Sequence, residues 1–317
     1  MKRAIHILSA ATIVVASAAA SAGAECVVPS KPGGAMDLTC KLAQKALPDR
    51  QLKLAYLPGG IGAVAWHTLV SQRRAEPDTL VAFSGGSLLN LAEGKFGKAN
   101  AADVRWVAAL GVDYGMIAVR ADSPWRTLGE LLDAIRRDPQ QVLVGVSGTI
   151  GSQDWMKVAL LARRAGIEPR RLRFVALEGG GETFTAMNAN YVQVISGDAS
   201  EAALYADHGK VRVLAVLAEH RLPGVLAAVP TAREQGYDVV WPVIRGLWMG
   251  PGVSDADYRR WVDAFARVQQ TPEFAQMRAG SGLYPFSLTG DALTRWVRQA
   301  INDYNRQARE FNLVREH

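Results

Sequence analysis

The stretch Val27-Val-Pro-Ser-Lys-Pro-Gly-Gly-Ala-Met-Asp-Leu-Thr-Cys-Lys41 organises the rest of the chain. An apolar strand ends at two prolines, which cannot donate to a sheet ladder, and an amphipathic helix follows the glycine pair. Gly33 and Gly34 allow a sharp turn and place no side chain between the backbone and a ligand. The first N–H groups of the helix lack intrahelical partners and carry the positive end of its dipole. The pattern therefore predicts a corner that receives an anionic group.

Residues 1–24 have the pattern of a secretory signal peptide. Lys2 and Arg3 precede an apolar, alanine-rich run, and the small residues Ala22-Gly-Ala24 follow as a cleavage site. The alternative, an uncleaved membrane anchor, is disfavoured because polar residues interrupt the run and because it is short for a span. We therefore expect cleavage after Ala24 and export of the mature chain to the periplasm.

Composition points to an ordinary globular protein rather than a nucleic-acid binder. The chain has 317 residues, of which 49% are hydrophobic and 21% charged, and this length suits two domains of modest size. The net charge of +6 includes two lysine and arginine charges of the signal peptide. Basic residues are densest between residues 163 and 173, but no aromatic ladder accompanies them. A solvated helix face is the favoured interpretation there.

The chain has 2 cysteines, Cys26 and Cys40, and both lie in or beside the organising stretch. An oxidising compartment favours a disulfide that ties the first strand to the first helix, worth about 3 kcal/mol in the chain-entropy model. Two buried thiols are the alternative. Glu25 stands directly before Cys26, where a lipoprotein signal needs a small residue, so we do not expect a lipid anchor. With few histidines, two cysteines do not make a zinc site, and we expect no metal and no cofactor.

Short apolar strands alternate with helical patterns, which predicts an α/β fold with mainly parallel sheets. The order strand, glycine corner, helix occurs before residue 121 and is repeated after it. We expect two lobes that face each other across a cleft, with lobe 1 at 25–120 and 243–317 and lobe 2 at 121–242. The chain then crosses between the lobes twice, which permits a hinge. Besides the first strand and helix, the expected strands are 51–56, 79–84, 106–110, 116–120, 142–147, 172–176, 192–196, 211–217 and 247–250. The later helices are 62–73, 128–137, 153–165, one that follows the corner 178–181 and includes Phe184 and Met187, 255–270, 272–279 and 289–310.

The candidate binding residues gather at the glycine corners, because ligands of parallel sheets lie beyond the carboxyl ends of the strands. Lys31 either provides a positive charge for a bound anion or is a surface-loop residue without a binding role. Ser152 either binds a solute or caps the helix that follows. Asp37 is expected to accept hydrogen bonds from the amides of the first corner. The full set of candidates is Ser30, Lys31, Gly33, Gly34, Asp37, Gly85, Ser147, Gly148, Thr149, Gly151, Ser152, Gln153, Gly180 and Asp198.

Enzyme motifs are weak in this chain. Gly60-Ile-Gly-Ala-Val-Ala65 fits a dinucleotide fingerprint, but Phe83-Ser84 stands where the acidic residue is required, so a backbone wall of the cleft is the better interpretation. Gly145-Val-Ser-Gly-Thr149 lacks the last glycine of a nucleophile elbow. The histidines of the mature chain are scattered and not at relay or ligand spacing. Abundant hydrogen-bond donors without an acid–base or nucleophile set favour binding over catalysis.

Several motifs together resemble the periplasmic solute-binding proteins of tripartite tricarboxylate transporters, the Bug family. Pro32-Gly-Gly-x-x-Asp37 resembles the first-strand loop of the family, and Pro58-Gly-Gly-Ile-Gly62 resembles its second glycine loop. Val146-Ser-Gly-Thr-Ile-Gly-Ser152 is similar to the Gly/Ser loop of the second lobe, and Pro230-Thr-Ala-Arg-Glu-Gln-Gly236 resembles the Pro-Thr-x-x-Glu-x-Gly signature. Glu25-Cys-x-x-Pro-x-Lys-Pro-Gly-Gly, with a second cysteine after Asp-Leu-Thr, is most similar to the tricarboxylate-binding branch.

The resemblance implies a two-lobed periplasmic-binding fold of type II that closes on a carboxylated solute. It also implies delivery of that solute by a monomeric receptor to a two-subunit membrane carrier driven by an ion gradient. The cysteines and Lys31 favour citrate or a relative. Family members often carry Tyr-Lys-Gly where this chain has Leu177-Glu-Gly179, which places an acidic residue near the site. The alternatives are an exported hydrolase of small acids and a binding protein that signals to a membrane kinase.

Overall fold

The computed structural model describes residues 23–206 and 209–314. The predicted signal peptide therefore lies outside the described residues, apart from its last two positions. Among the described residues, no helix combines the length and the apolar character that a bilayer span requires.

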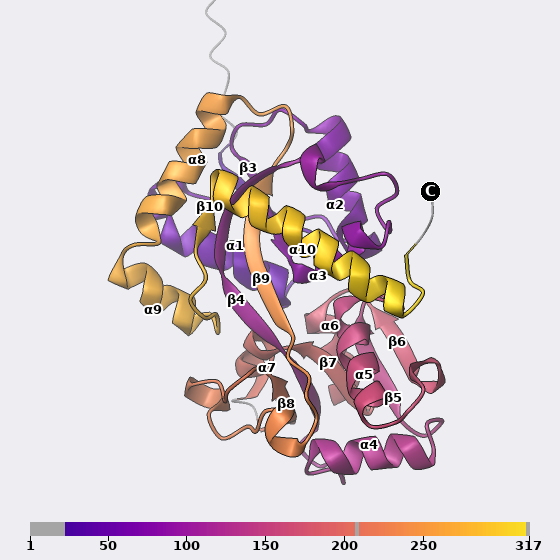
Figure 1. The fold of residues 1–317 in the computed structure, drawn as a ribbon. Coiled ribbons are helices and arrows are strands. Elements are labelled where there is room, and N and C mark those ends of the chain that lie inside the picture. The colour runs from indigo at the N-terminus through magenta and orange to yellow at the C-terminus, as the bar shows by residue number, and fades with distance from the viewer. Residues whose placement is uncertain (1–22, 207–208, 315–317) are drawn as a thin grey trace, which may run out of the picture.

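Helices and strands alternate along the described chain largely as expected (Figure 1). The strands are β1 (Glu25–Val28), β2 (Lys53–Tyr56), β3 (Thr79–Ser84), β4 (Arg105–Arg120), β5 (Leu143–Ser147), β6 (Arg173–Leu177), β7 (Val194–Asp198), β8 (Val211–Leu217), β9 (Pro242–Met249) and β10 (Leu288–Thr289). The helices are α1 (Ala35–Ala46), α2 (Ala63–His67), α3 (Gly85–Ala92), α4 (Leu128–Arg137), α5 (Gln153–Arg164), α6 (Gly180–Asn188), α7 (Ala199–Ala206), α8 (Asp255–Val268), α9 (Pro272–Gly280) and α10 (Gly290–Glu310). The helix expected at 62–73 is divided, because its second half, Thr68–Gln72, is a π-helical turn.

The prediction of two separate strands at 106–110 and 116–120 was wrong, because β4 is one continuous strand of 16 residues. The polar residue Asp113 lies between these two apolar runs. In the structure it sits inside the strand with its carboxylate fully used: it accepts from the amide of Tyr114 and from the Ser200 hydroxyl, and it pairs with Arg245. A buried polar group with such partners is compatible with a central strand.

Two groups of parallel strands are joined by the long strands β4 and β9. The sheet order is β2-β1-β3-β9-β4-β7-β5-β6, with β8 and β10 also paired to β4. Strand β1 is parallel to β2 and β3, and β5 is parallel to β6 and β7. The ladders of β4 and β9 are antiparallel, so the sheet as a whole is mixed. Figure 1 shows β4 and β9 running from the half that contains β1–β3 to the half that contains β5–β8.

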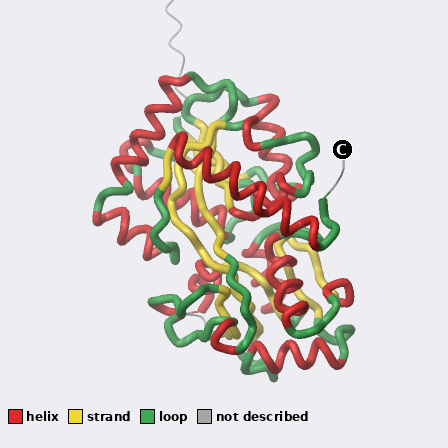
Figure 2. Tube along the Cα trace, viewed as in Figure 1, coloured by secondary structure: helices red, strands yellow, loops and turns green. Residues whose placement is uncertain are grey.

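Helices flank the strands of both halves (Figure 2), so each half has its own buried core. The half that contains β1–β3 has two hydrophobic clusters. One includes Trp261, Phe265 and Phe274 of α8 and α9, and the other includes Trp66 and Trp106. Helices α8, α9 and α10 pack on this half, and α10 lies against α3. Both halves are therefore layered α/β units.

Cys26 and Cys40 form a disulfide between β1 and α1, so the predicted bond is present and the alternative of two thiols is excluded. The two sulfurs close a loop with a sequence separation of 14 residues, and both side chains are fully buried. The glycine corner Gly33-Gly34 lies inside this loop. The disulfide therefore limits how far the strand end and the helix start can separate.

Candidate functional site

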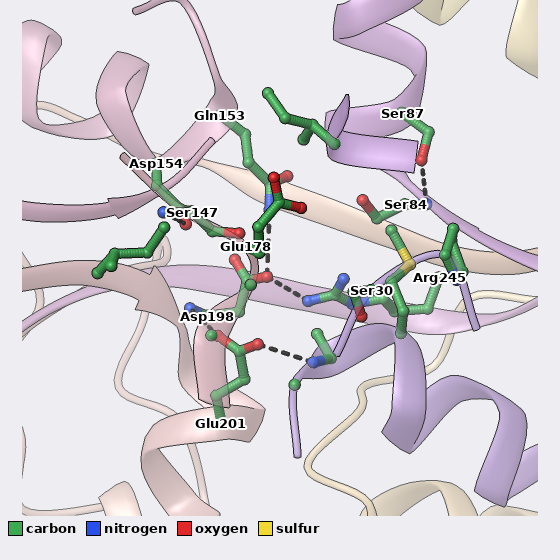
Figure 3. A pocket seen from close by; sticks show the side chains of 18 residues that line it. Ser30, Ser84, Ser87, Ser147, Gln153, Asp154, Glu178, Asp198, Glu201 and Arg245 are labelled. Atoms are coloured by element: carbon green, nitrogen blue, oxygen red, sulfur yellow. Dashed lines mark hydrogen bonds and ion pairs between the residues drawn. The ribbon is translucent and has the colours of Figure 1, made fainter. Parts of the chain in front are cut away.

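The first turns of helices α1, α3, α5 and α6 meet at one cavity of about 70 Å³. Each of these helices follows the carboxyl end of a strand, β1, β3, β5 and β6 respectively. Helices α1 and α3 belong to one half of the molecule, and α5 and α6 to the other. The cavity lining is Pro29, Ser30, Gly34, Ala35, Met36, Ile61, Ser84, Ser87, Ser147, Gln153, Asp154, Leu177, Glu178, Gly179, Gly180, Asp198, Glu201 and Arg245 (Figure 3).

Serine hydroxyls supply hydrogen-bond donors to this cavity. Ser84 caps α3 by accepting from the amide of Gly86, and the Ser87 hydroxyl oxygen accepts in turn from the amide of Ser84. Ser147 stands at the end of β5. Within the described chain, no group accepts a hydrogen bond from the hydroxyls of Ser84, Ser87 or Ser147. These three O–H groups are therefore available to an acceptor in the cavity.

A paired cluster of buried charges forms one wall of the cavity. The ammonium of Lys157 bonds Asp154 at 2.8 Å and Asp198 at 2.6 Å, and the guanidinium of Arg245 bonds Asp198 as well. All four side chains are buried. Burial acts to raise the pKa of Asp198, but the nearby charges of Lys157 and Arg245 hold this pKa below its ordinary value. Asp198 is therefore an ionised carboxylate whose charge is already matched.

Glu201 is a second buried carboxyl on the cavity, and it differs from Asp198 in having no cationic partner. One carboxyl oxygen accepts from the amide of Ala35 at 2.7 Å, and the other accepts from the amide of Asp198 at 3.3 Å. Among the described residues, no lysine or arginine forms an ion pair with it. Burial is the main reason that the pKa of Glu201 is raised to about 8, and the charge of Asp198 adds to this effect.

Gly180 is required where α6 begins against Glu201. A Cβ atom at position 180 would overlap the carboxyl group of Glu201, so any larger residue displaces that side chain. Gly34 of the first corner is also close, since its Cβ would lie 3.4 Å from a carboxyl oxygen of Glu201. The Glu201 carboxyl thus sits between the N-termini of α1 and α6, one from each half of the molecule.

The structure brings some of the sequence-predicted residues to the cavity and leaves others outside its lining. Ser30, Gly34, Ser147, Gln153, Gly180 and Asp198 line it, and Ser152 lines an adjoining recess together with Gln153. The predicted residues outside this lining are Lys31, Gly33, Asp37, Gly85, Gly148, Thr149 and Gly151.

The contacts of the outlying residues explain where they lie. Lys31 donates to Glu182 at 3.0 Å at the mouth between the halves, and both side chains are partly exposed. Asp37 accepts from the amide of Gly33 at 3.0 Å, so the expectation that it bonds the first corner is confirmed. Gly85 packs under the Tyr304 hydroxyl. These residues shape the corners rather than the cavity surface.

Two backbone amides of the predicted anion-binding corners donate to side chains of the protein itself. The Ala35 amide is bonded by Glu201, and the Ser147 amide donates to Asp154 at 3.1 Å. The prediction that the first N–H groups of α1 face the solute directly was therefore wrong for Ala35. Acidic side chains are stabilised at helix N-termini for the same reason that ligand anions are. The Glu201 carboxyl therefore occupies the position at the start of α1 that was predicted for the solute.

Sequence reasoning missed the deepest residues of the site. Arg245 is a lone charged residue inside the otherwise apolar strand Val243–Met249, and this signal was visible. Asp154 and Glu201 stand in the first turns of α5 and α7, where acidic residues are common on exposed faces. Only long-range pairing, between residues more than 40 positions apart in the case of Lys157 and Asp198, shows that they are buried.

The two halves touch across the cavity. Besides Glu201 and Ala35, the ammonium of Lys95 donates to the carbonyl oxygen of Ile150 at 2.9 Å. The side chain of Gln153 packs directly against Gly86, where a Cβ atom would lie 2.9 Å from the Gln153 amide carbon. The arrangement is therefore a closed one. In the part of the chain that the structure describes, no group of three or more His, Cys, Asp or Glu residues is placed to hold a metal ion.

The fold is that of two-lobed solute-binding proteins. The chain is similar to MatC (Rpa3494) from Rhodopseudomonas palustris with bound malate, at 20% identity and a TM-score of 0.77, over 89% of this chain and 97% of that one. It is also similar to R. palustris Rpa4515 with adipate, at 18% identity and a TM-score of 0.81, over 90% and 96% of the two chains. At these identities the likeness establishes the fold alone.

The family follows from the sequence itself. Residues 91–313 match the family described as "Tripartite tricarboxylate transporter family receptor". A curated relative, a UPF0065 protein of Bordetella pertussis (strain Tohama I), is 22% identical over 306 residues, which cover 92% of this chain and 93% of the relative. The chain belongs to this receptor family, and it is a transport solute-binding protein rather than an enzyme. The resemblance to the Bug family is confirmed.

Proposed function

We propose that this protein captures a small carboxylate in the periplasm and delivers it to the membrane subunits of a tripartite carrier. The observation that carries the proposal is the convergence of four helix N-termini, those of α1, α3, α5 and α6, on one cavity between the two halves. Each N-terminus contributes a partial positive charge, and a carboxylate is the kind of solute that such a convergence attracts.

The hydroxyl groups refine the proposed position of the carboxylate. Ser84 and Ser87 come from one half and Ser147 from the other, and all three line the cavity. A carboxylate between them accepts hydrogen bonds from both halves, so its binding favours the closed arrangement. Hydrogen bonds to a charged acceptor contribute about 1.5–3 kcal/mol each. Solved relatives with malate and adipate support a carboxylate as the solute class.

We propose lobe limits of 25–120 with 243–317 for lobe 1 and 121–242 for lobe 2. Strands β4 and β9 run through both halves and pair with each other, and their crossing is the proposed hinge. Opening about these strands breaks the contacts of Glu201 with Ala35 and of Lys95 with Ile150 and gives the solute a way in. The receptor is proposed to act as a monomer.

Within the carboxylates, the proposed solute depends on Lys31. A citrate-like tricarboxylate, with Lys31 as a selectivity element, is the candidate that the sequence favours. Because Lys31 is paired with Glu182 outside the cavity lining, a solute must displace that pair to use the lysine. A role in sensing, with a signal passed to a membrane kinase, stays open beside transport. Loss of solute uptake on deletion of the gene supports transport, and unchanged uptake supports sensing.

The test is calorimetry on the mature chain, unfolded and refolded to remove any carried solute. The titrants are citrate, malate, succinate, adipate and their amino- and hydroxy-substituted relatives. We expect at least one to bind, and Ser84→Ala and Ser147→Ala to weaken that solute about tenfold or more. Ser71→Ala, on an exposed position outside the cavity, is the matched control. Absence of binding by every carboxylate contradicts the proposal.

A further inference from the structure

Glu201 is a buried acid that forms no ion pair with a lysine or arginine of the described residues, although the charge of Arg245 acts on it. Its exposed fraction is 4%, it lines the cavity, and within the described residues its hydrogen bonds come from two backbone amides. An ionised carboxyl in such a place is costly unless a positive charge joins it. The other buried acids of this wall, Asp154 and Asp198, are both bonded by Lys157.

The cavity lining as a whole carries more acid than base. Four carboxyl side chains line it, from Asp154, Glu178, Asp198 and Glu201, against the single guanidinium of Arg245. Even with Lys157 behind this wall, carboxyl groups outnumber cationic groups, and this holds when Glu201 is protonated. A solute with two or three carboxylates has to bring one of them close to these acids, and like charges at short range repel strongly at low dielectric.

Resting on the proposed function, we propose that Glu201 is the specificity-determining residue of the site and that it binds a protonated amine, so that the solute is an aminocarboxylate. The ammonium group pairs with Glu201, and Glu178 on the same cavity adds a second negative charge. The solute thus supplies the cation that no described residue places in an ion pair with Glu201.

The carboxylate end of the solute has its own partners. Arg245 is 1% exposed and lines the cavity, and within the described residues its buried Nε–H group has no acceptor. The free hydroxyls of Ser84 and Ser147 lie on the same lining. Donors for a carboxylate and an acceptor for an ammonium are therefore present together, which is the pattern that a zwitterion requires.

Proton release gives an independent sign of the pairing. Burial raises the pKa of Glu201 to about 8 in the closed structure, so its carboxyl holds a proton at pH 7. The groups that face it are Asp198 and Asp154, whose charges favour the proton, and Arg245, whose charge opposes it. An ammonium placed beside Glu201 lowers this pKa, and binding then releases a proton.

The test compares solutes that differ only in an amine in place of a hydroxyl group. Calorimetry on the mature chain at pH 7 measures the dissociation constants of three matched pairs: malate and aspartate, 2-hydroxyglutarate and glutamate, 2-hydroxyadipate and 2-aminoadipate. We expect the amine-bearing member of the best-bound pair to bind at least tenfold more tightly, with proton release seen as a heat that changes with the ionisation enthalpy of the buffer.

A variant of Glu201 tests whether this residue causes the preference for an amine. Glu201→Gln keeps the size and an acceptor for the Ala35 amide, and we expect it to reduce the amine preference at least tenfold and to abolish proton release. Glu273→Gln, at an exposed position on α9, is the same substitution outside the site and should change neither the amine preference nor the proton release.

The outcomes separate the two proposals. Equal or tighter binding of the members without an amine overturns the inference and leaves the carboxylate receptor standing, and this comparison needs only the wild-type chain. An amine preference that Glu201→Gln leaves unchanged overturns the role of Glu201. If no member of any pair binds and every other carboxylate fails too, the proposed function itself is contradicted.

Discussion

Asp198 and Glu201 stand three positions apart on the same cavity wall, yet their surroundings differ in kind. Asp198 is held by the charges of Lys157 and Arg245, and its pKa is lowered. Glu201 is held by two amides and its pKa is raised. The first acid belongs to a completed set of ion pairs, and the second forms no ion pair with a described lysine or arginine. The difference teaches that burial alone does not separate a structural acid from a candidate binding residue, and that the presence or absence of a paired cation has to be considered as well.

Removal of Lys157 tests the ion pairs around Asp198, and it has the largest expected effect on stability. Lys157→Met leaves Asp154 buried without a cation and Asp198 with Arg245 alone, so we expect the free energy of unfolding to fall by about 3–5 kcal/mol. Denaturant unfolding measures it. Arg306→Met removes an exposed arginine that pairs with the exposed Asp303, and it should cost about 1 kcal/mol or less. Equal effects of the two variants would mean that the buried cluster is not a stabilising pair.

Gly180→Ala tests the packing around the unmatched carboxyl. The new methyl group would overlap the Glu201 carboxyl, so the side chain has to leave the Ala35 amide. We expect a loss of about 1–3 kcal/mol in the free energy of unfolding. The double variant Gly180→Ala/Glu201→Ala relieves the clash, so its loss should be less than the sum of the two single losses. Additive losses would show that the contact is absent in solution.

The pH dependence of stability tests the charge state of Glu201. Between its ordinary pKa of 4.5 and its folded pKa of about 8, the folded chain keeps a proton that the unfolded chain has released. The free energy of unfolding therefore decreases as the pH rises from about 5 to 8, and this contribution is lost above the folded pKa. Glu201→Gln removes the contribution.

Thermal unfolding of the two proteins from about pH 5 to about pH 9 measures this difference. Relative to Glu201→Gln, the wild type should lose stability with rising pH, because the other titrating groups are common to both chains. Parallel curves across this range would show that Glu201 has an ordinary pKa.

The smallest effect is expected at the mouth of the site. Lys31 is half exposed and pairs with Glu182, so Lys31→Ala should change the free energy of unfolding by about 1 kcal/mol or less. The dissociation constant of a monocarboxylate should change less than twofold. A much larger loss for a tricarboxylate than for a monocarboxylate would instead support Lys31 as a selectivity element.

The framework of the molecule was accessible from the sequence because it depends on local patterns. Glycine corners after short apolar strands gave the positions of α1, α5 and α6, and the two cysteines gave the disulfide. The two halves and the last three helices followed from the same alternation. Periodicity failed at β4, where Asp113 and its neighbours resemble a turn in sequence, whereas partners from β9, α7 and Tyr284 hold them in an extended strand.

The corners of the candidate site were predictable, but its charges were not. Ser147, Gln153 and Gly180 were found by their place after a strand. Arg245, Asp154 and Glu201 meet only through tertiary pairing, and the α1 corner alone does not show that a carboxyl from α7 fills it. The chemistry that decides selectivity thus comes from contacts between residues far apart in sequence.

The most direct test of the account is a crystal structure of the mature chain with the tightest-binding carboxylate of the calorimetric panel. The account predicts the solute in the cavity between the halves, with its carboxylate within hydrogen-bond distance of at least one hydroxyl of Ser84, Ser87 or Ser147. A solute bound elsewhere, with this cavity closed and unchanged, would contradict it.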